Sequence, residues 1–496
     1  MNTTTTKIGL IQTAPLPGDF SNNLRAIVQG YRECLEHGAD IVIAPAAALC
    51  GLEPRSLASR RSFIAQTRAA LDTLSRELGN APLLLAAYTM MVNDDEIYVG
   101  LVGEDDEMDA SMQEKDQSVI LTPYLLEKDC VTELENCSTV TINGKTYFTE
   151  TSDEELLPDE EFDFMVRLPN NPWYAGAARD DAETRKWEAR MSGTTVICCR
   201  PVGTVGGNVY GGGSGVYSAE GQTLLRLPFF ESAAKVVDIA RTAAPVLNLP
   251  EAEELLTSAL ERGIRDNVRN NCFSGVCIPL DHPHSALLGV LCVEALGAAN
   301  VCGITFEADA SLADKLGINC FRPHTEELAA AAKAALGGEE SAALTERLRS
   351  AIAITHAESR GMMYCSPLGR REIMLGEFHM YGLSAGHLAP LGNLYDVDIY
   401  LLSERFREEY SDVFGSITEP PHGVTNRIIH ELADLNTPPS VLVREEMNYL
   451  FKENDVRLIQ RKLMASAIKR TQLPIILHVD APIEQLSFPL ANRLND

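Results

Sequence analysis

Short apolar runs alternate with amphipathic stretches from the N-terminus onward, and this alternation constrains the fold more than any other feature. Residues 7–12, 41–43 and 82–87 are brief apolar runs, which predicts strands buried in a sheet. Residues 22–37 and 63–78 repeat apolar side chains at helical spacing, which predicts helices with one face packed on those strands. Alternating strands and helices are typical of a layered α/β domain.

The same pattern returns in the second half of the chain, in the order of a doubly wound parallel sheet of the nucleotide-binding sort. Its helices and strands are expected at residues 251–270, 275–278, 285–296, 301–306, 310–316, 325–336 and 342–358. Between the halves, residues 242–250 interrupt the pattern and contain prolines, so we expect a linker between domains at 1–241 and 251–496. From residue 438 the tail is predicted to be helical up to Lys469.

The charge balance excludes some classes of partner. A chain of 496 residues with 45% apolar residues can bury two or three cores, and its net charge is −28. A nucleic-acid surface needs clustered Lys and Arg, and the basic residues form nothing longer than adjacent pairs such as Lys469-Arg470. No uncharged apolar run reaches the roughly 20 residues that span a bilayer, and residues 1–7 contain no apolar signal region. We therefore expect a cytoplasmic protein that binds neither nucleic acid nor membrane.

Twelve cysteines are scattered along the chain without a Cys-x-x-Cys pair. Most lie among apolar residues, as Cys34, Cys272 and Cys277 do. Such residues are predicted to be buried free thiols in a reducing compartment, and neither a disulfide framework nor a metal site is expected from them. Two acidic stretches, 104–116 and 152–163, are predicted to be solvated loops.

Landmarks in both halves occur in the order found in one enzyme family. In the first half they stand at residues 18–19, 22, 38–40, 45, 51–57, 201–203, 212–216 and 221–231. In the second half they stand at 259–273, 285–287, 294–297, 381–382, 389–390, 394–395, 469–474 and 489–493. Together they resemble glutamine-dependent NAD synthetase over nearly the whole chain.

The resemblance implies two joined domains with different chemistry. The first would be a nitrilase-type amidase with an α-β-β-α sandwich, which in this family releases ammonia from glutamine. The second would be an ATP-pyrophosphatase-type domain, which adenylates nicotinate adenine dinucleotide and amidates it. Assembly into large homo-oligomers is also implied, and ATP and Mg²⁺ would be cofactors only if the family activity is retained.

The catalytic residues of the amidase are not found at their expected positions. A nitrilase-type site uses a glutamate base, a lysine that stabilises the tetrahedral intermediate and a cysteine nucleophile. The resemblance assigns these positions to Ala46, Thr122 and Thr151. Lys128 is near the lysine position but out of register, and Cys137 is the cysteine nearest to Thr151. The sequence therefore predicts that glutaminase activity is lost.

The phosphate-binding loop of the second domain is also altered. The family has a Ser-Gly-Gly-x-Asp-Ser turn, whose backbone N–H groups face the ATP pyrophosphate at a helix N-terminus. This chain has Asp281-His282-Pro283-His284 before Ser285, so both glycines are gone and Pro283 removes a donor. His282 and His284 could share a metal ion, but the sequence offers no clear third or fourth ligand, so no metal site is predicted.

Other positions of the second site either match the family pattern or depart from it. Ser285, Glu372, Lys469 and Arg470 persist and are the candidate nucleotide-binding residues. Two positions have lost their expected groups: the aspartate after Tyr-Gly is Leu383 and a lysine after Leu-Tyr is Asp396. For Lys469 and Arg470 a structural role at a helix C-terminus or an interface is the alternative.

Three hypotheses follow from this pattern. The first is an inactive paralogue with a structural or regulatory role, as a homo-oligomer or together with an active NAD synthetase. The second is an active synthetase whose site residues have diverged. The third is a new ligand-binding or enzymatic role built on Asp281, His282, His284 and Glu372.

Overall fold

The computed structural model describes residues 6–92, 117–152, 158, 160–240, 248–339, 341–415, 423–443 and 451–480. The chain forms two compact units, one of residues 1–205 and 210–249 and the other of 206–209 and 250–496. The expected loop at 104–116, most of the expected linker and the landmark at 489–493 lie outside the described residues.

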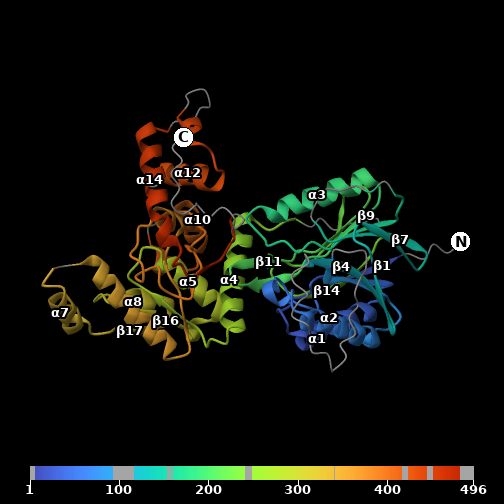
Figure 1. Ribbon diagram of the computed structural model, residues 1–496, viewed down its shortest axis with the longest axis horizontal. Coiled ribbons are helices and arrows are strands. Elements are labelled where there is room, and N and C mark those ends of the chain that lie inside the picture. Colours follow the sequence, from blue (N-terminus) through green and yellow to red (C-terminus); the bar gives the residue numbers. More distant parts are fainter. Residues whose placement is uncertain are drawn as a thin grey trace, which may run out of the picture. The chain divides into compact units, whose positions relative to one another are not determined.

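The first unit contains two six-stranded sheets (Figure 1). Strands of the first sheet, in spatial order, are β14 (Ala233–Asp238), β1 (Lys7–Gln12), β2 (Ile41–Ala46), β3 (Leu83–Val92), β4 (Gln117–Glu127) and β5 (Cys130–Glu133). Strands of the second are β13 (Thr223–Arg226), β12 (Gly215–Tyr217), β9 (Thr195–Cys198), β8 (Phe164–Arg167), β7 (Lys145–Glu150) and β6 (Ser138–Ile142). The strands β1, β2 and β3 are parallel to one another, as are β7, β8 and β9.

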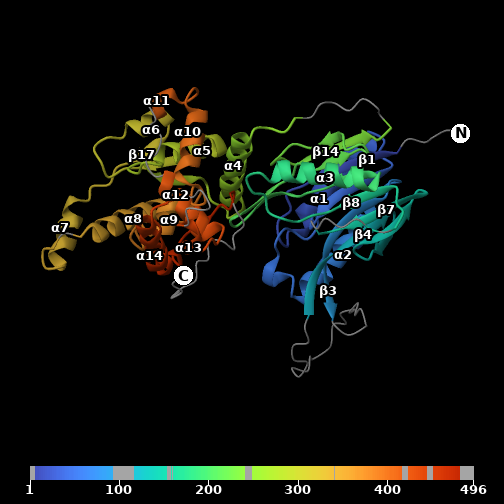
Figure 2. The ribbon, with the colours of Figure 1, turned by 90° about the horizontal axis from the view of Figure 1, so that it is seen from above.

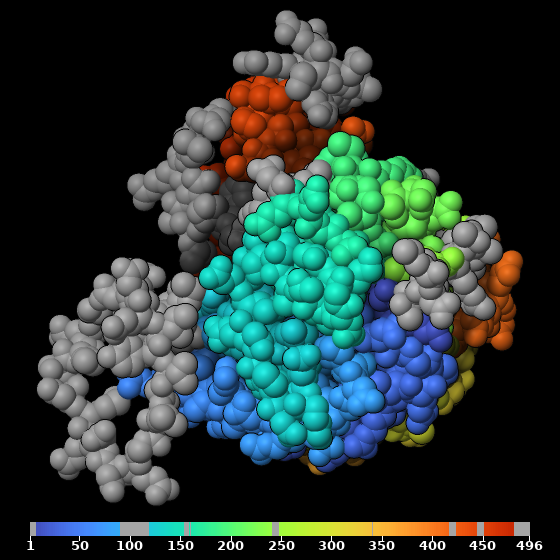
Figure 3. Space-filling model, turned by 90° about the vertical axis from the view of Figure 1, so that its right-hand side faces the viewer, coloured from blue at the N-terminus to red at the C-terminus, as the bar shows by residue number. Residues whose placement is uncertain are grey.

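Helices cover the outer faces of both sheets. The helices α1 (Phe20–Glu36) and α2 (Arg61–Glu77) lie on the side of the first sheet that faces away from the second, and α3 (Ala177–Ser192) covers the second sheet (Figures 1 and 2). In Figure 3 the teal surface of the second-sheet segments lies beside the blue surface of the N-terminal segments. The predicted α-β-β-α sandwich is therefore present.

Alternation along single strands builds these layers. Leu10 packs in the core between the two sheets, whereas its neighbour Ile11 packs against α1. Successive side chains of a strand point to opposite faces, so a strand that is apolar at every position has both faces buried. The uninterrupted apolar runs that predicted these strands thus also reflect their position between two layers.

The second unit is built on a four-stranded parallel sheet. Its order is β17 (Asn319–Phe321), β16 (Val301–Ile304), β15 (Val276–Pro279) and β18 (Met363–Tyr364). Cys277 packs with Ala353 and Ala357 of α8 (Ala342–Glu358). The next residue, Ile278, lies near Gly289 of α5 (Ser285–Leu296). Helices therefore cover both faces of the sheet, as predicted.

The remaining elements complete the two units. In the first unit they are a 3-10 turn (Arg55–Leu57) and the strand β10 (Val202–Val205), and β11 (Asn208–Gly211) has residues in both units. In the second they are α4 (Ala252–Asn270), α6 (Ser311–Leu316), α7 (Glu326–Ala335), α9 (Arg370–Leu375), α10 (Asp396–Phe406), α11 (Ser411–Phe414), α12 (Gly423–Ile429), the π-helical turn His430–Asp434, α13 (Pro439–Leu442), α14 (Glu453–Arg470) and the paired strands β19 (Leu388–Ala389) and β20 (Ile475–Ile476).

Two predictions need correction. The tail is not one helix, because Lys452 has extended backbone angles and α14 begins only after it. Cys272 is exposed, since it lies in the turn that ends α4 and has a positive φ of 60°. All twelve cysteines are free thiols, and eight of them are buried. None of the described helices is long and apolar enough to cross a membrane.

Candidate functional site

The three positions that the resemblance assigns to glutamine hydrolysis come together in the first unit. Ala46 ends β2 and pairs with Ala86 of β3. On the next strand, Thr122 of β4 pairs with Ala87. Thr151 follows β7 in the opposite sheet, and its hydroxyl donates to the carbonyl of Leu121 at 3.4 Å. The structure thus groups these positions around the ends of β2 and β7, although they are far apart in the sequence.

None of the three side chains can act as a base, a cation or a thiolate at neutral pH. Ala46 is fully buried in the apolar core between the sheets. The Thr122 hydroxyl shares a 2.6 Å hydrogen bond with the Thr89 hydroxyl. The nearby Cys50 is no substitute nucleophile, because complete burial raises the pKa of its thiol to about 12. The side chains at these positions are therefore a packed apolar methyl group and neutral hydroxyl groups.

Charged groups are present next to Thr151, but they bind one another. The buried carboxylate of Glu150 pairs with Arg167, which also donates to Glu188 at 2.7 Å. Arg185 donates to the second oxygen of Glu188 at 2.7 Å, so β7, β8 and α3 are joined by one chain of opposite charges. Removing one member of a buried pair leaves an uncompensated charge, so this chain holds α3 on its sheet.

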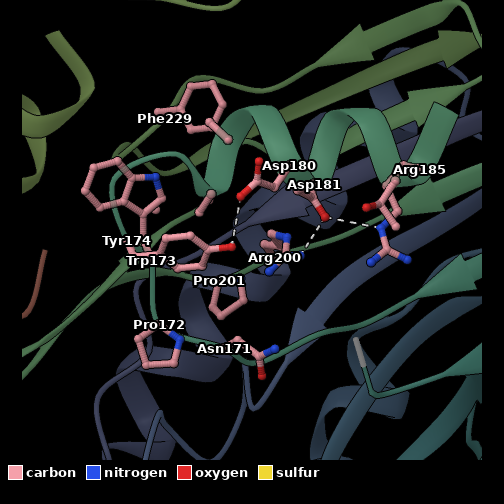
Figure 4. A pocket seen from close by; sticks show the side chains of 15 residues that line it. Asn171, Pro172, Trp173, Tyr174, Asp180, Asp181, Arg185, Arg200, Pro201 and Phe229 are labelled. Atoms are coloured by element: carbon pink, nitrogen blue, oxygen red, sulfur yellow. Dashed lines mark hydrogen bonds and ion pairs between the residues drawn. The ribbon is translucent and has the colours of Figure 1, made fainter. Parts of the chain in front are cut away.

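The chain of charges ends at a cavity of about 260 Å³ beside the start of α3 (Figure 4). Asp181 accepts hydrogen bonds there from Arg200 at 2.6 Å and from Arg185 at 3.2 Å. Burial raises the pKa of Asp181, but the two guanidinium groups outweigh it and hold the pKa below its usual range. Aromatic rings complete the wall, from Trp173, Tyr174 and Phe229. Sequence reasoning missed this cavity, because its lining comes from four separated segments without a motif.

In the second unit, the altered loop connects β15 to α5. Parallel strands end at one edge of the sheet, and ligands of doubly wound sheets bind at such an edge. The Asp281 carboxylate accepts hydrogen bonds from the Thr305 hydroxyl and from the Phe306 N–H, the latter at 2.7 Å. It therefore links the segments that follow β15 and β16. Ser285, the retained serine, is fully buried, and its hydroxyl accepts the His282 N–H at 3.2 Å.

Two imidazoles and one carboxylate meet above this loop. The Nε2 atom of His282 lies 3.2 Å from Oε1 of Glu372, and Nδ1 of His284 lies 3.5 Å from Oε2. Glu372 belongs to α9, so the third potential ligand comes from 90 residues further along the chain. Sequence reasoning left the two histidines without a third ligand, and the structure supplies it.

The environment sets the charge of this cluster. Burial lowers the pKa of His284 below its ordinary value, and the charge of Glu372 opposes this only in part. Burial also raises the pKa of Glu372, but the hydrogen bond from His282 and the N–H of Gly369 at 2.9 Å outweigh it, so the net shift is downward. Glu372 is therefore an ionised carboxylate at neutral pH, and it lies beside the two histidine rings.

Comparisons with known proteins cover both units. Residues 256–450 match the model of the NAD synthase family. A glutamine-dependent NAD(+) synthetase from Thermotoga maritima is 24% identical over 463 residues, with 79% of each chain covered. One from Synechocystis is 22% identical and aligns over 94% of both chains. A crystal structure of the Cytophaga hutchinsonii glutamine-dependent NAD(+) synthetase has a TM-score of 0.82 and 13% identity, covering 99% of this chain and 98% of that one.

This chain belongs to the glutamine-dependent NAD(+) synthetase family. Its substitutions can therefore be compared with the pattern of that family. Asp396, at the position that the resemblance assigns to a lysine, begins α10 and accepts a hydrogen bond from Nε of Arg371 at 2.6 Å. The charge of Asp396 is thus balanced inside the protein. Leu383, at the aspartate position, packs against the cluster around Ile373, and its N–H donates to Glu346 at 2.7 Å.

The two retained cations contact the backbone at the end of one helix. Nζ of Lys469 donates to the carbonyls of Gly376 and Phe378 at 2.6 and 2.7 Å. Arg470 donates to the carbonyl of Met374 at 3.0 Å. These carbonyls stand at and after the C-terminus of α9, where cations are favoured by the helix dipole. Of the two alternatives left by the sequence, these contacts are those of the structural role.

Proposed function

We propose that this chain is a catalytically inactive member of the glutamine-dependent NAD(+) synthetase family, kept for a structural or regulatory role in an oligomer. The observation that carries the proposal is the grouping of Ala46, Thr122 and Thr151 at the glutaminase position of the fold. Loss of one member of a catalytic unit lowers kcat by orders of magnitude. All three are replaced here by groups that cannot take their roles.

The synthetase position supports the same conclusion by different means. A phosphate cradle needs free backbone N–H groups at a loop before a helix. Here Pro283 has none, the His284 N–H donates to Nδ1 of His282 at 3.2 Å, and Asp281 adds a negative charge. Lys469 and Arg470 contact backbone carbonyls instead of facing this loop. The described loop therefore favours neither ATP nor its Mg²⁺ complex.

The proposed role requires assembly, either with further copies or with an active NAD synthetase. Two large apolar side chains stand one turn apart on the outer side of α3, Trp187 with 42% and Met191 with 60% of its surface exposed. Exposed tryptophan is uncommon on a monomer and is enriched where proteins meet. We include this surface in the proposed assembly contacts.

Enzyme assays on the purified full-length protein test the loss of activity. Ammonia release from glutamine and ATP-dependent formation of NAD should both stay at the level of the buffer blank. The Thermotoga maritima relative, a glutamine-dependent NAD(+) synthetase, serves as the positive control. Turnover in either assay would overturn the proposal and favour an active synthetase with divergent site residues.

Light scattering and co-purification test the assembly. The wild-type protein should have a mass of several 54.2 kDa chains, or should co-purify with the NAD synthetase of its own cells. Trp187→Glu combined with Met191→Glu should lower that mass. Arg25→Glu, at an exposed position of α1, is the control and should leave the mass unchanged. A monomer that captures no synthetase would contradict this part of the proposal.

A new role of the second site is the other candidate function. It is favoured by a specific observation, namely that His282, His284 and Glu372 remain polar and converge, whereas the positions in the first unit became neutral. A thermal shift with ATP, NAD or nicotinate adenine dinucleotide detects any retained ligand, because a ligand that binds only the folded form raises its Tm.

A further inference from the structure

We propose that His282, His284 and Glu372 form a binding site for one divalent first-row transition-metal ion, with Zn²⁺ as the representative ion. This site goes beyond the proposed inactive role. It uses loop residues that replace a phosphate cradle, and it requires neither nucleotide nor glutamine.

Geometry is the first support for the site. One potential ligand atom from each residue lies within 4.8 Å of the other two. The two short separations involve different oxygens of Glu372, since Nε2 of His282 lies 3.2 Å from Oε1 and Nδ1 of His284 lies 3.5 Å from Oε2. Tetrahedral Zn²⁺ with bonds of about 2.0–2.1 Å holds its ligand atoms about 3.4 Å apart. Each histidine and its nearest carboxylate oxygen therefore stand at about the separation of two ligands of one ion.

Burial and support are the second argument. Between 8% and 13% of each of the three side chains is exposed, so an ion would be shielded from most of the solvent. Glu372 is fixed by the Gly369 N–H, which donates to Oε2 at 2.9 Å. Such a surrounding hydrogen bond orients a metal ligand and raises affinity. An ion would displace the proton of each ring nitrogen that binds it, including Nδ1 of His284, which now lies 3.2 Å from the Pro367 carbonyl, since ligands bind metals in deprotonated form.

The donor atoms choose the class of ion. Mg²⁺ and Ca²⁺ prefer six or more oxygen ligands, whereas two imidazoles and a carboxylate suit Zn²⁺, Co²⁺ and Fe²⁺. Three protein ligands leave a position for water or a small anionic or carbonyl ligand, which is the arrangement of reactive rather than structural zinc sites. Asp281 does not compete for the ion, because both of its oxygens accept hydrogen bonds from Thr305 and Phe306.

Titration of the full-length protein with Co²⁺ tests the site directly, after resident metal has been removed with a chelator. One equivalent should bind and give the visible absorption of four-coordinate Co²⁺, and Zn²⁺ should then displace it. No thiolate-to-metal charge-transfer band should appear, which separates this site from the twelve cysteines. A thiolate band, displacement by millimolar Mg²⁺, or no binding would each overturn the proposal.

Variants assign the binding to these residues. His282→Ala, His284→Gln and Glu372→Gln should each weaken Co²⁺ binding by more than about 100-fold, beyond the loss typical of residues that only orient a ligand. His379→Ala is the matched control, since His379 forms a 2.7 Å pair with Glu346 without a second imidazole. Circular dichroism confirms that each variant is folded. Unchanged affinity in folded His282→Ala and Glu372→Gln proteins would overturn the proposal, whatever the enzyme assays show.

Discussion

The two regions that would carry chemistry in this family have diverged in opposite ways. In the first unit, the positions that the resemblance assigns to catalysis, Ala46, Thr122 and Thr151, carry an apolar methyl group and hydroxyls bonded to their neighbours. In the second unit, His282, His284 and Glu372 keep titratable groups and join them into a cluster. The first region has become part of a core, whereas the second has remained a polar site of different composition.

The difference follows from where each region lies. Ala46 is inside the core between two sheets, where an unpaired charge is costly and a small apolar side chain is not. The loop after β15 lies at the carboxyl ends of the parallel strands. Polar side chains there can form hydrogen bonds with one another. The first region is therefore filled by packed apolar and neutral side chains, whereas the second holds a polar cluster.

Restoring a carboxylate at Ala46 is expected to have the largest effect. Ala46→Glu would bury a charge without a partner and overfill a packed core, for a loss of about 5 kcal/mol in the free energy of unfolding. Both tryptophans, Trp173 and Trp187, lie in the first unit, so their fluorescence during urea unfolding reports on this unit alone. Ala26→Glu, on the exposed side of α1, is the control and should be nearly neutral. A stable Ala46→Glu protein would break the comparison, because the region would then still accommodate a base.

Breaking the buried chain of charges should have the next largest effect. Arg167→Met leaves the Glu150 carboxylate in the core without its cation, for an expected loss of ~3–5 kcal/mol. Tryptophan fluorescence again reports the change. Arg32→Met removes the exposed Arg32–Glu77 pair and should cost at most about 1 kcal/mol. If both variants lost equal stability, the charges beside Thr151 would not be the structural element inferred here.

The second region should show pH dependence through Glu372. Its pKa in the folded protein lies below the ordinary value, so its contribution to stability is present above about pH 4.3 and is lost as the pH falls through the folded pKa. Glu372→Gln should therefore be less stable than the wild type by about 1–2 kcal/mol at pH 7, with a difference that shrinks toward pH 3. Far-UV circular dichroism in urea measures it, with exposed Glu453→Gln as control. A difference independent of pH would mean that the charge of Glu372 is unimportant.

The smallest effect is expected at the retained cations. Lys469→Met removes a charged donor from the C-terminus of α9, for a loss of about 1–2 kcal/mol. Lys462→Met, which removes an exposed 3.2 Å pair with Glu377, should lose less. Thermal shifts with ATP should be unaffected by Lys469→Met. A thermal shift present in the wild type and lost in this variant would return Lys469 to a nucleotide site.

Much of the fold could be predicted because its signals are local. The periodicity of residues 285–296 and 342–358 predicted α5 and α8 with the bounds that the structure has. The strand that ends at Ala46 could also be predicted from its apolar run. The predicted helical tail failed at Lys452, where extended backbone angles interrupt the helix without a glycine or proline to mark the place.

The sequence by itself determined the layered α/β class, the family and the residue types at the positions that the resemblance assigns to catalysis, because each depends on residue type and on spacing along one segment. Only the tertiary structure decided what surrounds those residues. Glu372 joins two histidines from 90 residues away, and Glu150, Arg167 and Glu188 neutralise one another across three elements. Burial, pairing and shared coordination depend on distances between segments, and those distances are set by packing rather than by local pattern.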